Sequence, residues 1–168
     1  CSSGTDVLSL AAMLVSQNKA DIIGVLAADC LEPGKLLQHF ALGTQAADQA
    51  RPFDANRSGT SFAEGAGFAI IANQRGLAKL NAPLAFNILG FGMSCDAMNI
   101  TAPDQSGAIP ALALQRALKS AACASADIGY INAHASGTAL NDQVETLAMQ
   151  KTLGGQLQHI PLSGSKGA

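Results

Sequence analysis

Short apolar runs that alternate with helical segments constrain the fold of this chain more than any other feature. Residues 21–28 (Asp-Ile-Ile-Gly-Val-Leu-Ala-Ala) are typical of a central strand in a parallel sheet. Further strands are expected at 65–72, 84–90, 127–133 and 161–163. Helical patterns occur at 4–18, 33–40, 109–120 and 142–153. Strands that alternate with helices predict an α/β fold with a mainly parallel sheet.

Composition narrows the class of protein. The 168 residues suffice for one ordinary domain, and only 13% of them are charged. A net charge of −2 gives no reason to expect nucleic acid or an anionic membrane as partner. No apolar run is long enough to span a membrane, and the start of the chain does not resemble a signal peptide. Four scattered cysteines without a Cys-x-x-Cys pair argue against a metal site or disulfide framework, and favour the cytoplasm.

Three segments carry side chains suited to chemistry, each among small residues that leave room for a substrate. They contain Cys1, His134 and Lys166. Cys1 precedes the expected helix 4–18, whose N-terminus would lower the pKa of the thiol and offer N–H groups to an oxyanion. A cysteine with a distant histidine is a nucleophile–base arrangement suited to acyl transfer. From the residues alone, Lys166 also fits an ordinary solvated lysine.

Five motifs follow one another along almost the whole chain. They are Cys-Ser-Ser-Gly at 1–4, Arg-Pro-Phe-Asp-x-x-Arg at 51–57 with Ala-Glu-Gly-Ala-Gly at 63–67, Asp-Ala-x-x-x-Thr-Ala-Pro at 96–103, His-Ala-Ser-Gly-Thr at 134–138 with Asp142, and Lys-Gly-Ala at 166–168. In order and spacing they resemble the β-ketoacyl-acyl carrier protein synthases, the decarboxylating condensing enzymes of fatty-acid and polyketide synthesis. Five motifs in order make chance agreement improbable.

The resemblance implies a thiolase-like fold, a five-layered α-β-α-β-α sandwich of two similar halves. Residues 1–76 would be the C-terminal part of the first half, and residues 77–168 the N-terminal part of the second. The family's second active-site histidine would lie beyond residue 168. We therefore expect the chain to be a central fragment of a longer protein. On its own, this fragment would fold poorly and be inactive.

The resemblance also assigns roles to residues. Cys1 would carry the acyl group, and His134 would donate a hydrogen bond to the thioester oxygen as negative charge develops there. Lys166 would organise the site electrostatically. Ser136 and Thr138 would bind the phosphopantetheine arm, although both also fit ordinary loop hydroxyls. The implied partners are an acyl carrier protein and a second ketosynthase subunit, identical or not, and the protein would need no cofactor of its own.

Three carboxylates are candidates for supporting roles. Glu64, between small and apolar residues, is expected to be buried and paired behind the site. Asp96 belongs to the third motif. Asp142 with Glu145 resembles a capping box for helix 142–153, so Asp142 either supports the site or only caps the helix. We expect Asp54 and Arg57 to fix a loop.

Departures from the family pattern keep other functions open. Alanine replaces the usual glycine at Ala63 and Ala135, and Asn99 stands where the family often has histidine. One alternative is a non-catalytic partner subunit, although such subunits typically lack the cysteine. A second is an N-terminal cysteine hydrolase, in which the amine of Cys1 is the base. A third is a non-decarboxylating thiolase, against which the motifs at 51–57 and 63–67 count.

Overall fold

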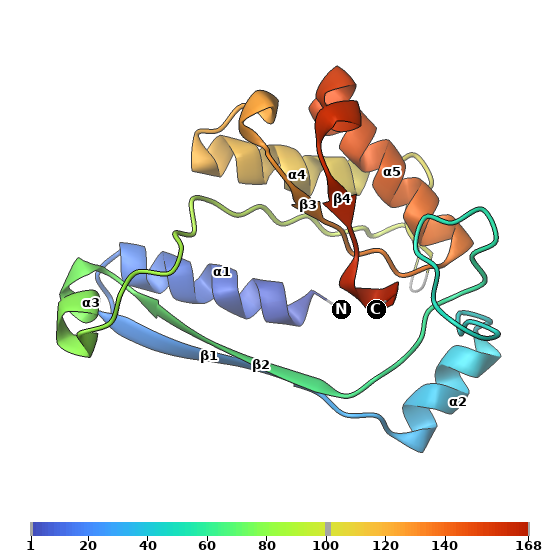
Figure 1. Ribbon diagram of the computed structural model, residues 1–168, viewed down its shortest axis with the longest axis horizontal. Helices are drawn as coiled ribbons and strands as arrows, with labels where there is room; N and C mark the ends of the chain where they lie inside the picture. The colour runs from blue at the N-terminus through green and yellow to red at the C-terminus, as the bar shows by residue number, and fades with distance from the viewer. Residues whose placement is uncertain (1, 100–101, 168) are drawn as a thin grey trace. The chain divides into compact units, whose positions relative to one another are not determined.

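The computed structural model describes residues 2–99 and 102–167, which form two compact units (Figure 1). The first unit combines the residues up to Cys30 with Ala63–Leu89. The second combines Leu31–Phe62 with the residues from Gly90 onward. Helices and strands occur in both, which agrees with the expected α/β class. The predicted boundary between residues 76 and 77 remains a prediction.

The first unit is a helix packed on a two-stranded sheet. Its elements in chain order are α1 (Ser3–Ser16), β1 (Ile22–Asp29), β2 (Gly65–Ala72) and α3 (Gln74–Leu80). Helix α1 contacts both strands and buries Ala11 and Val15. Strands β1 and β2 run antiparallel along their whole length. The expectation of a parallel β1 is therefore wrong, because β2 returns as its direct neighbour in the opposite direction.

The sequence analysis missed one helix of the first unit and expected one strand that is absent. The missed helix is α3, which the Asn73 side chain caps by accepting a hydrogen bond from the backbone N–H of Gly76 at 2.8 Å. Asp21 contacts the same helix through Lys79 and Arg75. Hydrogen bonds from Lys79 and Asn73 lower the pKa of Asp21 to about 2. Residues 84–90 do not form the expected strand, since none of the described residues pairs with them.

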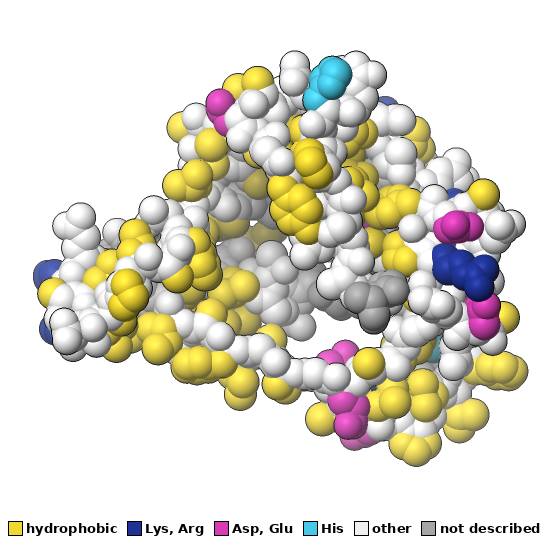
Figure 2. Space-filling model, in the orientation of Figure 1, with side chains coloured by type: hydrophobic (Ala, Val, Ile, Leu, Met, Phe, Trp, Pro, Cys, Tyr) yellow, Lys and Arg dark blue, Asp and Glu magenta, His cyan; other side chains and the backbone are white. Residues whose placement is uncertain are grey.

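Several large apolar side chains of the first unit are exposed. Leu10 of α1 is 50% exposed and Phe68 of β2 is 68% exposed. Figure 2 shows apolar side chains along the surface of the β1–β2 sheet. Among the described residues the two strands pair only with each other, so they lack the neighbours that would bury a central strand. No helix within the described residues is both long and apolar enough to cross a membrane.

The second unit packs two helices beside a short parallel strand pair (Figure 1). Its elements are α2 (Pro33–Ala41), α4 (Ala108–Ala121), η1 (Ser125–Asp127), β3 (Ile131–Asn132), α5 (Ala139–Leu153), η2 (Gly154–His159), β4 (Leu162–Ser163) and η3 (Ser165–Gly167). Ala111 of α4 and Val144 and Ala148 of α5 are buried in this unit. Strand β3 is parallel to β4 and shorter than the expected 127–133. The parallel pair brings the segments after both strands to the same edge.

Helix α5 begins at Ala139, three residues earlier than expected. Thr138 is its N-cap, and its side chain accepts a hydrogen bond from the backbone N–H of Asn141 at 3.4 Å. The expected capping box of Asp142 and Glu145 is therefore wrong. Both carboxylates lie within the helix, on neighbouring positions of one face, and are free to bind the loop before it.

Candidate active site

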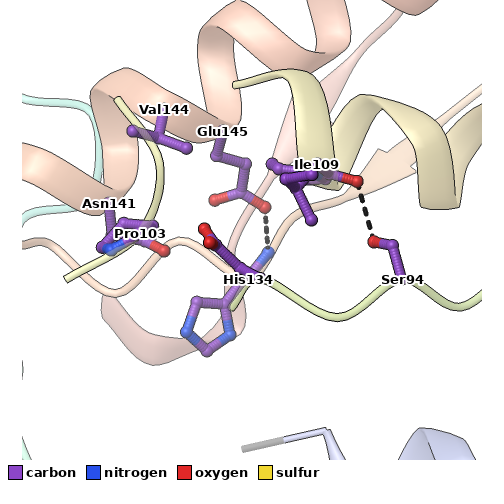
Figure 3. A pocket seen from close by; sticks show the side chains of 9 residues that line it. Ser94, Pro103, Ile109, His134, Asn141, Val144 and Glu145 are labelled. Carbon is purple, nitrogen blue, oxygen red and sulfur yellow. Dashed lines mark hydrogen bonds between the residues drawn. The ribbon is translucent and has the colours of Figure 1, made fainter. Parts of the chain in front are cut away.

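The loop that joins β3 to α5 presents His134, and Glu145 of α5 holds this loop in place. One carboxylate oxygen of Glu145 accepts the backbone N–H of His134 at 2.6 Å, and the other accepts that of Ala135 at 2.9 Å. Figure 3 shows the Glu145 carboxylate beside the His134 backbone. Charge-assisted bonds of this kind are about twice as strong as neutral ones. Glu145 therefore fixes the backbone from which the imidazole projects.

Asp142 holds the next part of the same loop. Its side chain is 1% exposed. It accepts the backbone N–H of Gly137 at 3.1 Å, the hydroxyl of Ser136 at 3.5 Å and the backbone N–H of Phe53 at 2.8 Å. Asp142 therefore binds the loop instead of capping the helix, and its supporting role in the reaction stays a prediction. Asp142 joins the 51–57 motif to the 134–138 motif.

Arg57 strengthens the same junction from the other side. Its guanidinium donates to the backbone carbonyl oxygens of Ala139 at 2.9 Å and Thr138 at 3.4 Å. Its Nε lies 3.7 Å from a carboxylate oxygen of Asp142. The expected loop-fixing contact is also present, because Arg57 donates to the carbonyl oxygen of Asp54 at 2.9 Å. Sequence reasoning missed the longer reach of Arg57 to α5.

The ammonium of Lys166 lies against His134. It donates to the backbone carbonyl of His134 and lies 3.4 Å from the imidazole Nδ1. His134 is exposed at the surface. Partial desolvation of its ring and the nearby Lys166 charge nevertheless lower the pKa of His134, while Glu145 acts in the opposite direction. The lowered pKa favours the neutral imidazole. Because an ammonium can only donate, its contact with Nδ1 favours the neutral tautomer that carries the ring proton on Nε2.

A pocket of about 300 Å³ adjoins His134 within the second unit (Figure 3). Its lining residues are Ser94, Asp96, Pro103, Ile109, Pro110, His134, Asn141, Val144 and Glu145. Asp96 accepts the backbone N–H groups of Met98 at 3.0 Å and Asp104 at 2.5 Å. Asp96 therefore fixes the backbone at Met98 and Asp104 beside the pocket, and its supporting role in the reaction stays a prediction.

Ser136 and Thr138 lie together at the end of the loop. Their hydroxyl oxygens are 3.0 Å apart. Both hydroxyls already have protein partners, since Ser136 bonds to Asp142 and Thr138 caps α5. Their role in binding phosphopantetheine stays a prediction, and a structural role accompanies it.

Two candidate residues are not placed with this group. Cys1 lies outside the described residues. Glu64 is exposed, so the prediction that it is buried is wrong. It directly precedes β2, which in the described residues has β1 as its only strand neighbour, and this edge position leaves the side chain at the surface.

Replacing Gly137 by alanine should destabilise the protein by about 2–4 kcal/mol. Gly137 has a φ of +77°, and an added Cβ would lie 2.5 Å from the carbonyl oxygen of Gly59. The substitution combines backbone strain with a clash against backbone. A thermal melt of the full-length variant measures the loss. Gly129→Ala is the matched control, because a Cβ at Gly129 meets open space; equal melting temperatures for the two variants would refute the prediction.

Comparison with known proteins shows the class of protein to which this chain belongs. The family model "Beta-ketoacyl synthase, N-terminal domain" matches residues 1–75, and "Beta-ketoacyl synthase, C-terminal domain" matches residues 85–168. A solved complex of a type II polyketide synthase acyl-carrier protein with its ketosynthase (AntDE:AntF), bound to the hexaketide, superimposes with a TM-score of 0.93 at 28% identity, over 99% of this chain and 43% of that one. The fold is therefore the thiolase-like α/β fold of ketosynthases.

The chain belongs to the β-ketoacyl synthase family. The 3-oxoacyl-[acyl-carrier-protein] synthase 2 of Rhizobium meliloti (strain 1021) is 32% identical over 176 residues, covering all of this chain and 42% of that protein. The ketosynthase ApeO, solved with its chain length factor ApeC from Xenorhabdus doucetiae, matches with a TM-score of 0.81 at 29% identity, over 92% of this chain and 37% of the other. The chain thus spans about two fifths of the length of these relatives.

Proposed function

We propose that the full-length protein containing this chain is a β-ketoacyl-acyl carrier protein synthase. The observation that carries this proposal is the Lys166 ammonium 3.4 Å from Nδ1 of His134, beside a pocket, an arrangement that favours a neutral ring with Nε2–H free to donate. A neutral donor of this kind is suited to a thioester oxygen that gains negative charge. Membership of the β-ketoacyl synthase family supports the same reaction.

The reaction has three steps, and Cys1 takes part in the first and the last. The Cys1 thiolate attacks the acyl-carrier thioester, and the carrier thiol leaves as the acyl group moves to sulfur. A malonyl-carrier thioester then loses CO₂. The electron pair of the broken C–C bond forms an enolate, and His134 Nε2–H stabilises the enolate oxygen. The enolate carbon attacks the Cys1 thioester carbonyl. The Cys1 thiolate leaves, and a β-ketoacyl group remains on the carrier.

The proposed partners follow from the substrates and from related complexes. The substrates would arrive on the phosphopantetheine of an acyl carrier protein, and Ser136 and Thr138 would bind this arm. A related ketosynthase was solved with its acyl-carrier protein, and another with a chain length factor. We propose that this protein likewise binds an acyl carrier protein and pairs with a second ketosynthase subunit, either a copy of itself or a related chain.

The experiment that tests this function follows both substrates. The full-length protein is incubated with an acyl carrier loaded with a short acyl group and with malonyl carrier labelled at its free carboxyl. We expect labelled CO₂ and β-ketoacyl carrier in equal amounts. Release of free acid from the acyl carrier would instead support the N-terminal hydrolase. Product without CO₂ would support a thiolase, and no turnover by the protein alone would support a non-catalytic partner subunit.

The pH dependence of decarboxylation should reflect the lowered pKa of His134. Protonation of Nδ1 removes the hydrogen bond from Lys166 and places two positive charges side by side. We therefore expect the rate of CO₂ release to fall as the pH is lowered. Because the pKa lies below the ordinary value of 6.5, the midpoint of this fall should lie below that pH. Lys166→Met should move the fall to higher pH. Identical profiles for the two proteins would contradict the assigned role of Lys166.

A further inference from the structure

The segment after β4 passes unusually close to the loop that carries His134. If Gly164 had a Cβ, that atom would lie 2.1 Å from the Cβ of Ala135. Two carbon atoms cannot approach so closely without displacement of the backbone or of a neighbour. Only glycine at position 164 therefore permits this approach, and the methyl group of Ala135 occupies the space that a side chain at 164 would need.

Ala135 cannot easily move away from this contact. Its side chain is fully buried, at 0% exposure. Its φ is +48°, in the left-handed region that residues with a Cβ seldom adopt. The Glu145 carboxylate accepts its backbone N–H at 2.9 Å. The loop backbone is thus fixed from α5, and the methyl group points to a defined place.

The contact lies between the strand pair and Lys166. Strands β3 and β4 end their pairing at Asn132 and Ser163, and the backbone N–H of Ala133 still donates to the carbonyl oxygen of Ser163 at 2.8 Å. Gly164 follows at once, and Lys166 is two residues further along. A displacement at Gly164 would therefore be passed on to Lys166 rather than absorbed by the sheet.

We propose that Gly164 is a positioning residue, because the space left by its missing side chain receives the methyl group of Ala135 and thereby sets the distance between the Lys166 ammonium and His134. The ammonium now reaches both the carbonyl oxygen and Nδ1 of His134. The catalytic consequence of this geometry rests on the proposed function, whereas the geometry itself does not.

The charges around the imidazole make this distance measurable. Lys166 faces His134 from the segment after β4, Glu145 and Asp142 face it from α5, and Asp96 lines the adjoining pocket. Lys166 disfavours the protonated ring, whereas Glu145 and Asp142 favour it. Moving Lys166 away leaves the carboxylates in place, so the pKa of His134 should rise.

Three variants of the full-length protein test the proposal: Gly164→Ala, Ala135→Gly and the double variant. The pKa of His134 is measured by NMR with ¹³C-labelled histidine, and its signal is assigned by its loss in His134→Gln. We expect Gly164→Ala to raise the pKa clearly. In the double variant the methyl group has moved from one side of the contact to the other, so the pKa should return to that of the parent. Gly129→Ala, in open space, should leave it unchanged.

Each possible result supports or refutes the proposed role of Gly164. An unchanged pKa in Gly164→Ala, or an equal rise in the presence and absence of Ala135→Gly, would overturn the proposal. If Gly164→Ala does not fold, the double variant decides alone: a folded protein with the parent pKa supports the proposal, and a misfolded protein or a raised pKa refutes it. The titration needs no turnover. A protein that shows the expected pattern but releases no CO₂ would therefore contradict the proposed function and leave this inference intact.

Discussion

Replacing His134 by alanine should slow the release of CO₂ from the malonyl-carrier thioester by roughly 10²–10³-fold, and should leave acyl loading intact. In the proposed mechanism His134 Nε2–H donates to the developing enolate, whereas loading would require the Cys1 thiolate and oxyanion donors near it. Single-turnover measurements separate the two half-reactions: the mass of the loaded protein reports the first, and labelled CO₂ reports the second.

The matched control is His159→Ala. His159 is exposed, and its ring has a 3.3 Å contact with the neighbouring Gln158. Both half-reactions should be unchanged in this variant. If His134→Ala lost loading and CO₂ release to the same extent, the histidine would serve the nucleophile instead. If neither changed, His134 would have no part in the reaction.

Asp142→Ala should lower the free energy of unfolding by about 3–5 kcal/mol. The carboxylate is buried and accepts hydrogen bonds from Phe53, Gly137 and Ser136. Its removal leaves the backbone N–H groups of Phe53 and Gly137 without this acceptor and takes the negative charge away from the Arg57 guanidinium. Asp142→Asn should lose less, because the amide oxygen still accepts and its size is unchanged. Urea denaturation of the full-length protein measures the difference as a lower midpoint.

Asp48→Ala is the control for this series. Asp48 lies at the surface in an ion pair with Arg51, and its side chain is 60% exposed. Exposed pairs contribute about 0–1 kcal/mol, so the midpoint should barely move. Equal midpoints for Asp142→Ala and Asp48→Ala would show that the junction between the 51–57 and 134–138 motifs does not stabilise the fold.

Local signals predicted most of the helices. Helices at 4–18, 33–40 and 109–120 were expected and appear as α1, α2 and α4. Pairing between strands depends on distant partners, and here the sequence misled: β1 is antiparallel and 84–90 is not a strand. An apolar run indicates that a strand is expected to be buried, but not which neighbour will lie beside it.

The roles of the acidic residues show the same limit. Asp142 and Glu145 look like a capping box by spacing, yet Thr138 caps the helix and both carboxylates bind the preceding loop. Two acidic residues three positions apart lie on the same face of a helix. This spacing could have indicated that Asp142 and Glu145 bind the same loop. The reach of Arg57 to Ala139 joins residues 82 positions apart, which no local pattern reveals.

The central claim is that Cys1 accepts an acyl group and passes it to a carbon nucleophile generated by decarboxylation. The most direct measurement is intact mass and peptide mapping of the full-length protein after incubation with acyl carrier alone, followed by addition of malonyl carrier. We expect one acyl group on the peptide that contains Cys1, its absence in Cys1→Ala, and its disappearance into β-ketoacyl carrier on addition of malonyl carrier. A stable acyl group on Cys1→Ala, or an adduct that malonyl carrier does not discharge, would contradict the account.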